Sequence, residues 1–209
     1  MTRTITLDEA LAQCPVAAIL RGVRPEEVIA HGEALHAAGI RVVEVPLNSP
    51  EPLLSIARLA ERFGEAMFVG AGTVLTVQGV ADVRQAQGRL IVAPNTDPEV
   101  IRASLAGGLV PVPGFATATE AFVALAAGAR RLKHFPAVSY GPQHLRQLKA
   151  VLPAEASVWV TGGVGPGDIK SWREAGAAAF GIGGELYRPG QSPAETLTKA
   201  RALVMAARS

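Results

Sequence analysis

The sequence predicts an α/β fold, a single compact (βα)8 TIM barrel with a short N-terminal helix, occupying residues 1–209 as one domain. Eight short apolar stretches alternate with helical segments along the chain, an order typical of a parallel barrel. Hydrophobic residues make up 49% of the 209 residues and charged residues 18%, which suits strands covered on both faces. The alternative is an open doubly wound sheet, which usually has fewer strands and one glycine-rich turn early in the chain.

The elements are expected in a regular order. A short helix is predicted at residues 6–10, because Thr6 is a typical N-cap and Glu9 follows three residues later. The apolar runs then predict strands at residues 16–22, 41–47, 66–74, 90–95, 109–114, 131–136, 157–161 and 177–182. Helices are predicted at residues 25–39, 50–64, 77–88, 97–107, 117–128, 142–152, 167–176 and from 193 to the end. Six of the first seven of these helices close on a glycine, and Asp97 followed by Pro98 marks a helix start.

Charge and composition argue against several classes of function. The net charge is +2 and no run of Lys or Arg is interleaved with aromatic residues, so nucleic acid is not an expected partner. Cys14 is the one cysteine and the four histidines lack a spacing such as HExxH, so no metal site is expected. Residues 1–13 contain no apolar signal core, and no apolar run reaches about 18 residues, which predicts a cytoplasmic protein that does not bind a membrane.

A lysine, Lys133, stands inside the sixth predicted strand. Side chains alternate between the two faces of a strand, so Lys133 shares its face with Arg131 and Phe135. In the second predicted strand the aliphatic side chains occupy the face expected to pack on helices, which leaves Glu44 pointing inward. Residues facing inward from alternate strands share a layer of such a barrel, and Arg21 ends the first strand. One carboxylate and two cations are therefore expected at one mouth of the barrel.

The lysine allows three interpretations. Its ammonium group could reach solvent at the strand end, or it could form a structural ion pair with Glu44, although such pairs are often no more stable than apolar replacements. The third is a nucleophilic lysine with a general acid/base, which requires an unprotonated amine, whereas an ordinary lysine titrates near 10.4. Arg21 would lower the pKa of Lys133 and Glu44 would raise it, so the sequence leaves the direction of the net shift open.

Two glycine-rich stretches follow the seventh and eighth predicted strands. The first contains Gly162 and Gly163 after Thr161, and the second contains Gly183 and Gly184. Glycines let backbone N–H groups approach an anion, and the loops after these two strands are where such barrels commonly bind phosphate. Each stretch alone is compatible with a plain turn. Both together, at the expected strand ends, predict a phosphate site.

Six short motifs occur in one order between residues 16 and 187. They are EVPLNSP at 44–50, GAGTV at 70–74, VAPN at 92–95, LKHFP at 132–136, TGG at 161–163 and GIGG at 181–184. Together they resemble the class I 2-keto-3-deoxy-6-phosphosugar-acid aldolases, the KDPG/KDPGal aldolase family. The motifs LRG at 20–22, PLNSP at 46–50, GPQ at 141–143 and LYRPG at 186–190 resemble the branch that acts on the 6-phosphogalactonate compound, whose gluconate epimer differs at C4.

Two residues depart from the pattern of the galactonate branch, and a third, Asn48, separates this chain from the gluconate branch. Thr161 stands where the galactonate branch tends to have valine and the gluconate branch has threonine. Gly184 replaces the usual serine and so removes a hydroxyl from the predicted phosphate site. Asn48 stands where the gluconate branch usually has an arginine, so carboxylate binding would fall to Arg21. Cleavage of the gluconate epimer, or of both epimers, therefore stays an alternative.

The resemblance implies a mechanism and a set of partners. Lys133 would form a Schiff base with the C2 ketone of a phosphorylated keto acid, and Glu44 would move the protons as pyruvate and glyceraldehyde 3-phosphate form. Thr73 and Pro94 would line the pyruvate pocket, and Phe115 and Phe135 would cover its apolar side. It also implies a homotrimer that needs no metal or other cofactor. The rivals are a phosphate-binding barrel isomerase or epimerase with Glu44 as its base, and a non-catalytic sensor of phosphosugar acids.

Overall fold

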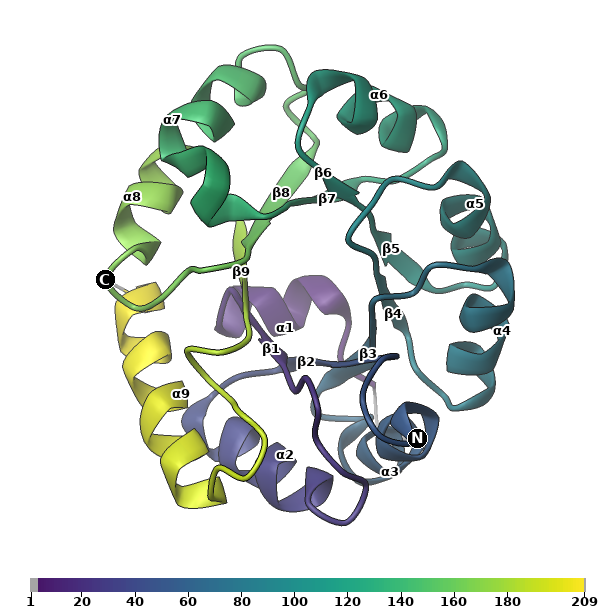
Figure 1. Cartoon of the computed structure of the whole chain (residues 1–209), viewed down its shortest axis with the longest axis vertical. Coiled ribbons are helices and arrows are strands. Elements are labelled where there is room, and N and C mark those ends of the chain that lie inside the picture. Colours follow the sequence, from purple (N-terminus) through teal and green to yellow (C-terminus); the bar gives the residue numbers. More distant parts are fainter. Residues whose placement is uncertain (1–3, 209) are drawn as a thin grey trace.

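Parallel strands form the centre of the molecule and helices surround them (Figure 1). The computed structural model describes residues 4–208. Its strands are β1 Val16–Ile19, β2 Val42–Pro46, β3 Phe68–Gly72, β4 Leu90–Val92, β5 Val110–Val112, β6 Gly114–Phe115, β7 Arg131–His134, β8 Ser157–Thr161 and β9 Ala179–Ile182. Its helices are α1 Leu7–Gln13, α2 Val28–Ala38, α3 Pro52–Phe63, α4 Val77–Gln85, α5 Pro98–Ala106, α6 Ala118–Ala126, α7 Ala137–Lys149, α8 Ile169–Glu174 and α9 Pro193–Arg208. Residues 1–3 and 209, at the ends of the predicted domain, lie outside the described residues.

The sheet closes into a barrel because the chain itself connects the two strands at the ends of the strand order. Its strand order is β5-β4-β3-β2-β1-β9-β8-β7-β6, so β5 and β6 stand at the two ends of the order although Pro113 alone separates them in sequence. Proline has no N–H for a ladder hydrogen bond, which divides the strand predicted at 109–114, while its carbonyl accepts the N–H of Lys133 at 2.7 Å. The predicted eight strand-plus-helix units are confirmed. The ninth strand arises from this division.

Several predicted helix boundaries are wrong by a few residues. The helix expected from residue 25 begins at Val28, because residues 25–27 form a turn. The helix expected from residue 142 begins at Ala137, and Gly141 kinks it with φ 75° and ψ 167° just before Pro142. The capping prediction for Thr6 and Glu9 is confirmed, since both hydrogen bonds of the capping box are present. None of the helices within residues 4–208 has the length and apolar character needed to cross a membrane.

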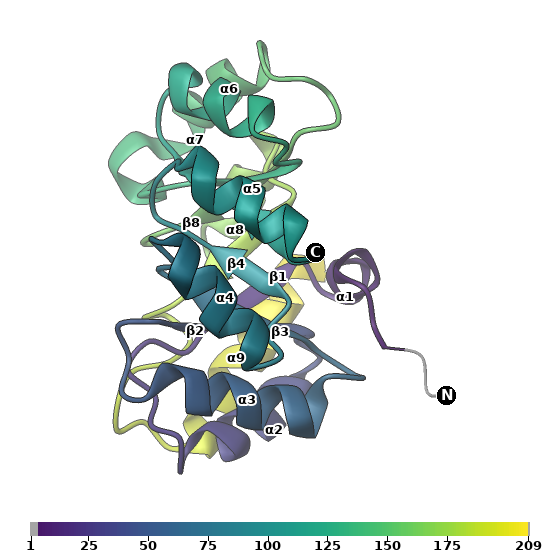
Figure 2. The ribbon, with the colours of Figure 1, turned by 90° about the vertical axis from the view of Figure 1, so that its right-hand side faces the viewer.

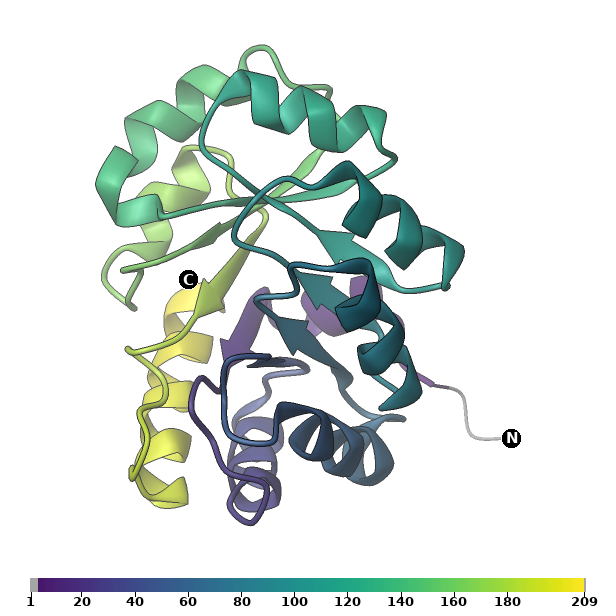
Figure 3. The same cartoon turned by 45° about the vertical axis from the view of Figure 1, so that its right-hand side comes forward.

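Two apolar layers pack the barrel. One lies between the strands and the surrounding helices, which are spread around the outside in Figures 1 and 3. The other fills the interior and includes Val42, Leu90 and Trp159. Leu7 and Ala10 of α1 belong to the interior layer, and Figure 2 shows α1 at one end of the barrel. The N-terminal helix thus closes the amino-terminal end of the strands and leaves the other end for a site.

Candidate active site

Lys133 and Glu44 point into the barrel from β7 and β2. The register pairs Lys133 with Trp159 of β8, and Trp159 packs in the interior layer together with Val42, two residues before Glu44. The alternate residue Leu132 packs in the layer beneath the helices. Lys133 retains 6% of its surface and Glu44 retains 3%. The predicted alternation on both strands is therefore confirmed, and it places an amine and a carboxylate in a nearly dry interior.

Glu44 owes its room to a glycine on the neighbouring strand. A Cβ atom added to Gly72 of β3 would lie 1.7 Å from the Glu44 Oε2 atom. No described residue donates a hydrogen bond to that oxygen. Burial raises the pKa of Glu44 from 4.5 to about 7, against the opposing effects of Lys133 and Arg21. A carboxyl group with this pKa can both take and give a proton near neutral pH.

The pKa of Lys133 is shifted in the opposite direction to that of Glu44. Burial lowers the pKa of its ammonium below the ordinary value, Glu44 opposes this, and Arg21 adds to it. Among residues 4–208, the side-chain amine of Lys133 makes no hydrogen bond and no ion pair, and its Nζ atom lies 4.7 Å from the ring centroid of Phe135. The structure thus supplies the direction of the shift that the sequence left open. At a given pH, a larger fraction of an amine with a lowered pKa is unprotonated, and only the unprotonated amine is a nucleophile.

Arg21 sits at the mouth, held from two neighbouring loops. Its Nη1 donates a hydrogen bond to the side-chain oxygen of Asn48, after β2, and its Nη2 donates to the Thr73 hydroxyl at 3.4 Å, after β3. Thr73 has φ 55°, in the left-handed region that β-branched residues rarely adopt. With this backbone conformation, the Thr73 hydroxyl lies within hydrogen-bond distance of the Arg21 guanidinium. The guanidinium remains exposed to a ligand at the mouth.

A cavity of about 230 Å³ lies beside Arg21 at the carboxyl ends of β8 and β9. It is lined by Ile19, Arg21, Phe135, Thr161, Gly162, Gly163, Val164, Gly181, Gly183, Gly184 and Glu185. Gly162 and Gly163 have φ values of 99° and 74°, which a side chain would strain. Within residues 4–208, the N–H groups of Gly162, Gly163, Gly183 and Gly184 donate no hydrogen bond. Four free donors on two loops suit an anion such as phosphate.

Two residues expected at the pyruvate pocket lie near β6. The Pro94 carbonyl lies beside Gly114 at the start of β6, where an added Cβ would stand 2.2 Å from it, and the place of Pro94 in a pyruvate pocket stays a prediction. Phe115, expected at the pyruvate pocket, faces outward and its ring meets His134 edge-on at 5.6 Å, since paired residues of β6 and β7 share a face. The sequence missed Glu185, whose carboxylate stands beside the glycine loops. Its position one residue past the second glycine pair was the available signal.

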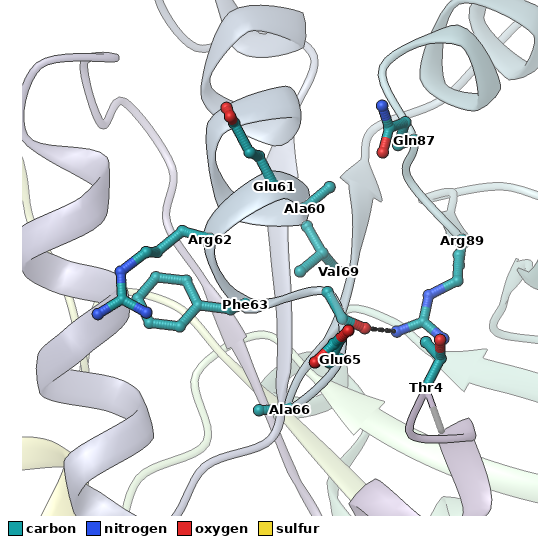
Figure 4. Close-up of a pocket in the computed structure, with 11 residues that line it drawn as sticks. Thr4, Ala60, Glu61, Arg62, Phe63, Glu65, Ala66, Val69, Gln87 and Arg89 are labelled. Atoms are coloured by element: carbon teal, nitrogen blue, oxygen red, sulfur yellow. Dashed lines mark hydrogen bonds between the residues drawn. The ribbon is translucent and has the colours of Figure 1, made fainter. Parts of the chain in front are cut away.

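A larger cavity, of about 530 Å³, lies elsewhere and holds a structural arginine. Figure 4 shows Arg89 in this cavity beside Thr4, Glu65 and the end of α3. Its guanidinium donates to three backbone carbonyls, those of Ile5, Gly64 and Met67. These bonds tie the N-terminal segment and two loops together. Its donors are thus engaged in the fold, and the chemistry of the barrel interior lies at the opposite end of the strands.

This chain matches a known protein family over most of its length. A family model described as KDPG and KHG aldolase matches residues 7–199. The chain belongs to this aldolase family. The 2-dehydro-3-deoxy-6-phosphogalactonate aldolase of Escherichia coli K12 is 46% identical over 93% of the chain and 95% of its own length. This aldolase therefore shares almost half of its residues with that relative over nearly the whole of both chains.

Two solved structures match over the same extent. A structure described as native KDPGal is 46% identical, with a TM-score of 0.92 over 94% of this chain and 95% of the other. A KDPG aldolase from Legionella pneumophila, described as having captured pyruvate as a covalent carbinolamine intermediate, is 26% identical. Its TM-score is 0.81 over 93% of this aldolase and 95% of the other chain. Both likenesses extend over the complete barrel.

Proposed function

We propose that this aldolase uses a lysine Schiff base to cleave 2-dehydro-3-deoxy-6-phosphogalactonate into pyruvate and glyceraldehyde 3-phosphate. The observation that carries the proposal is the buried Lys133, unpaired among the described residues and with a lowered pKa, in one interior with Glu44. Family membership supports a carbon–carbon lyase. The carbinolamine described for the Legionella relative supports covalent capture of a keto acid by an amine.

The reaction begins at Lys133. Its neutral amine attacks the C2 ketone of the substrate, and the carbinolamine loses water to give an iminium ion. Glu44 then takes the proton of the C4 hydroxyl group while the C3–C4 bond breaks and its electron pair moves into the iminium, giving an enamine. Glyceraldehyde 3-phosphate leaves, Glu44 returns its proton to C3, and water hydrolyses the imine to free pyruvate. A carboxyl group whose pKa is about 7 suits both proton transfers.

The two ends of the substrate have separate binding groups in this proposal. Arg21 and Thr73, joined by a hydrogen bond at the mouth, would hold the carboxylate. The free N–H groups of the glycine loops after β8 and β9 would hold the phosphate. Phe135 would cover the apolar side of the bound keto acid, beside the Lys133 Nζ atom. The absence of a serine hydroxyl at Gly184 leaves the backbone donors to carry phosphate binding.

A second candidate substrate is the gluconate epimer. Thr161 is the observation that favours it, because its hydroxyl stands in the cavity lining and could donate to the C4 hydroxyl of that epimer. Overall identity with the galactonate enzyme favours the first candidate. We therefore propose cleavage of the galactonate compound with relaxed discrimination against its epimer.

Steady-state cleavage of the two purified epimers, followed through the pyruvate released, tests the proposed function. We expect kcat/KM to be higher for the galactonate compound and measurable for the gluconate compound. Lys133→Arg should abolish both, because a guanidinium keeps its charge and has no free amine to attack the ketone. Turnover near wild type in this variant, or cleavage of neither epimer by the wild type, would reject the proposal.

The assembly and location expected from the sequence remain proposals. A symmetric homo-oligomer, a trimer in this proposal, is supported by exposed apolar side chains on successive helices, namely Leu105, Phe122, Val123 and Val138. Light scattering on a gel-filtration peak gives the mass that tests it. Cytoplasmic location is proposed from the sequence alone.

A further inference from the structure

Two adjacent loops are joined by a pair of hydrogen bonds at the mouth of the barrel. After β1, Arg21 donates to the Asn48 side chain and Gly22 donates its N–H to the Ser49 hydroxyl at 2.9 Å. Ser49 is buried, while Arg21 and Asn48 are exposed. Gly22 has φ 81°, so the turn that presents Arg21 needs a left-handed residue at this position. The Asn48 bond therefore fixes the side chain of Arg21, whereas the Ser49 bond fixes the backbone beside it.

The acceptor that Arg21 meets is a neutral amide. Within residues 4–208, Arg21 forms no ion pair, and two of its N–H groups are used by Asn48 and Thr73. A guanidinium has five N–H donors, so donors remain for a further acceptor. An aspartate has nearly the same shape as asparagine but would pair with the guanidinium as a charged, bidentate partner. Asparagine orients Arg21 without compensating its charge.

We propose that Asn48 is a positioning residue that holds the Arg21 guanidinium at the mouth, with its charge uncompensated, for the carboxylate of an incoming keto acid. The inference rests on the proposed function, because it takes a keto acid as the ligand of Arg21. The same uncompensated charge acts inside the barrel, where it favours the neutral amine of Lys133. The other charge acting on Lys133 is Glu44 from β2, and the adjacent strands β6 and β8 place the uncharged Gly114 and Trp159 beside it.

Two substitutions at one position separate charge from hydrogen bonding. Asn48→Asp keeps the acceptor and compensates the charge of Arg21, whereas Asn48→Ala removes the acceptor and leaves the charge. Ser49→Ala is the matched control, because it breaks the neighbouring bond of the same loop pair without touching the guanidinium. Asn48 is exposed, so both variants should fold, and their thermal unfolding provides the check.

The readout is the rate at which borohydride traps pyruvate on the protein, measured against pyruvate concentration and against pH. For Asn48→Asp we expect half-saturation at about tenfold more pyruvate, since a charge-assisted hydrogen bond to the carboxylate is lost. Its pH profile should also move to higher pH. Asn48→Ala should raise half-saturation by only a few-fold and leave the pH profile in place, and Ser49→Ala should resemble the wild type.

Other results would overturn the inference. If Asn48→Asp matches either the wild type or Asn48→Ala in both measurements, compensation of charge at Arg21 has no consequence. A wild type that traps no pyruvate would reject the proposed function instead. In that case the titration of ¹³C-labelled lysine, followed by NMR without any substrate, still decides: the Lys133 titration must move to higher pH in Asn48→Asp and stay in place in Asn48→Ala.

Discussion

At the scale of single residues, burial shifts the pKa values of the two ionisable groups of the interior toward each other. The pKa of Glu44 rises to about 7 while that of Lys133 falls, and in each case desolvation is the largest cause. Neither charge removes the cost of burying the other, because no ion pair joins Lys133 to a described carboxylate. The result is a carboxyl group that can take and give a proton near neutral pH, in one interior with an amine whose pKa is lowered. This is the arrangement that an imine-forming amine and a general acid/base need.

The raised pKa of Glu44 predicts a dependence of stability on pH. Between about pH 4.5 and 7 the unfolded chain loses the Glu44 proton and the folded protein keeps it, so wild-type stability falls as the pH rises through this window. Glu44→Gln cannot lose that proton. Its unfolding free energy relative to wild type should therefore increase between about pH 5 and about pH 7.5, by on the order of 2–3 kcal/mol in urea unfolding. A difference that stays constant across this range would mean that Glu44 is not buried with a raised pKa.

Thr161 predicts a change in epimer preference. Its hydroxyl lies over Gly181 of β9, where an added Cβ would stand 2.3 Å from Oγ1, and the residue is buried at the cavity wall. Thr161→Val keeps the shape and removes one hydrogen bond, which contributes about 0.5–1.5 kcal/mol, or up to roughly tenfold. The ratio of kcat/KM for the gluconate over the galactonate compound should fall by this factor. An unchanged ratio would show that Thr161 does not contact the C4 hydroxyl.

At the scale of elements, the strands decide which side chains meet and the loops decide how. The alternation of β2 and β7 could be predicted because the period of a strand is fixed and the aliphatic face of β2 is unambiguous. The outward position of Phe115 could not, because the division of the strand at Pro113 sets the register of β6 against β7. The contact between Arg21 and Asn48 also depends on side-chain directions after two strand ends. Such directions follow from tertiary packing.

The last residue of β3, Gly72, gives a prediction about the rate of cleavage. Gly72→Ala would place a methyl group 1.7 Å from the Glu44 carboxylate, on a strand that β2 holds in register through Pro46. Glu44 would have to leave its position, so cleavage should fall by about 10²-fold or more, the scale of a lost general acid/base. Gly167→Ala is the control, because no atom lies within 4 Å of the added Cβ. Equal activity in the two variants would show that the position of Glu44 does not matter.

The N-terminal helix predicts a contribution to stability. Leu7 of α1 is 3% exposed and packs in the interior layer at the base of the barrel. Leu7→Ala should lower the free energy of unfolding by about 2–5 kcal/mol, through lost burial and the space left behind. Asp8→Asn is the comparison, since its ion pair with Arg131 is largely exposed at Asp8 and should contribute about 1 kcal/mol or less. Similar losses for both would mean that α1 does not seal the barrel.

At the scale of the whole molecule, the barrel converges residues from distant parts of the chain on one end. Glu44 and Lys133 come from β2 and β7, Arg21 follows β1, and the glycine loops follow β8 and β9. The number and order of units could be predicted, because every unit repeats one apolar strand and one helix with recognisable ends. The division into nine strands could not be predicted, because it depends on where Pro113 interrupts the hydrogen bonds between neighbouring strands. The position of α1 across the amino-terminal end of the barrel likewise could not be predicted, because it depends on the packing of the interior layer.

The central claim is that Lys133 forms an imine with a keto acid. The most direct measurement is borohydride reduction in the presence of pyruvate, followed by peptide mass mapping of the adduct. The account predicts one reduced adduct, on Lys133, and none in Lys133→Met, whose apolar chain should keep the fold intact. The chain has three other lysines, Lys149, Lys170 and Lys199, which serve as internal controls. An adduct spread over these lysines, or an unmodified Lys133, would contradict the account.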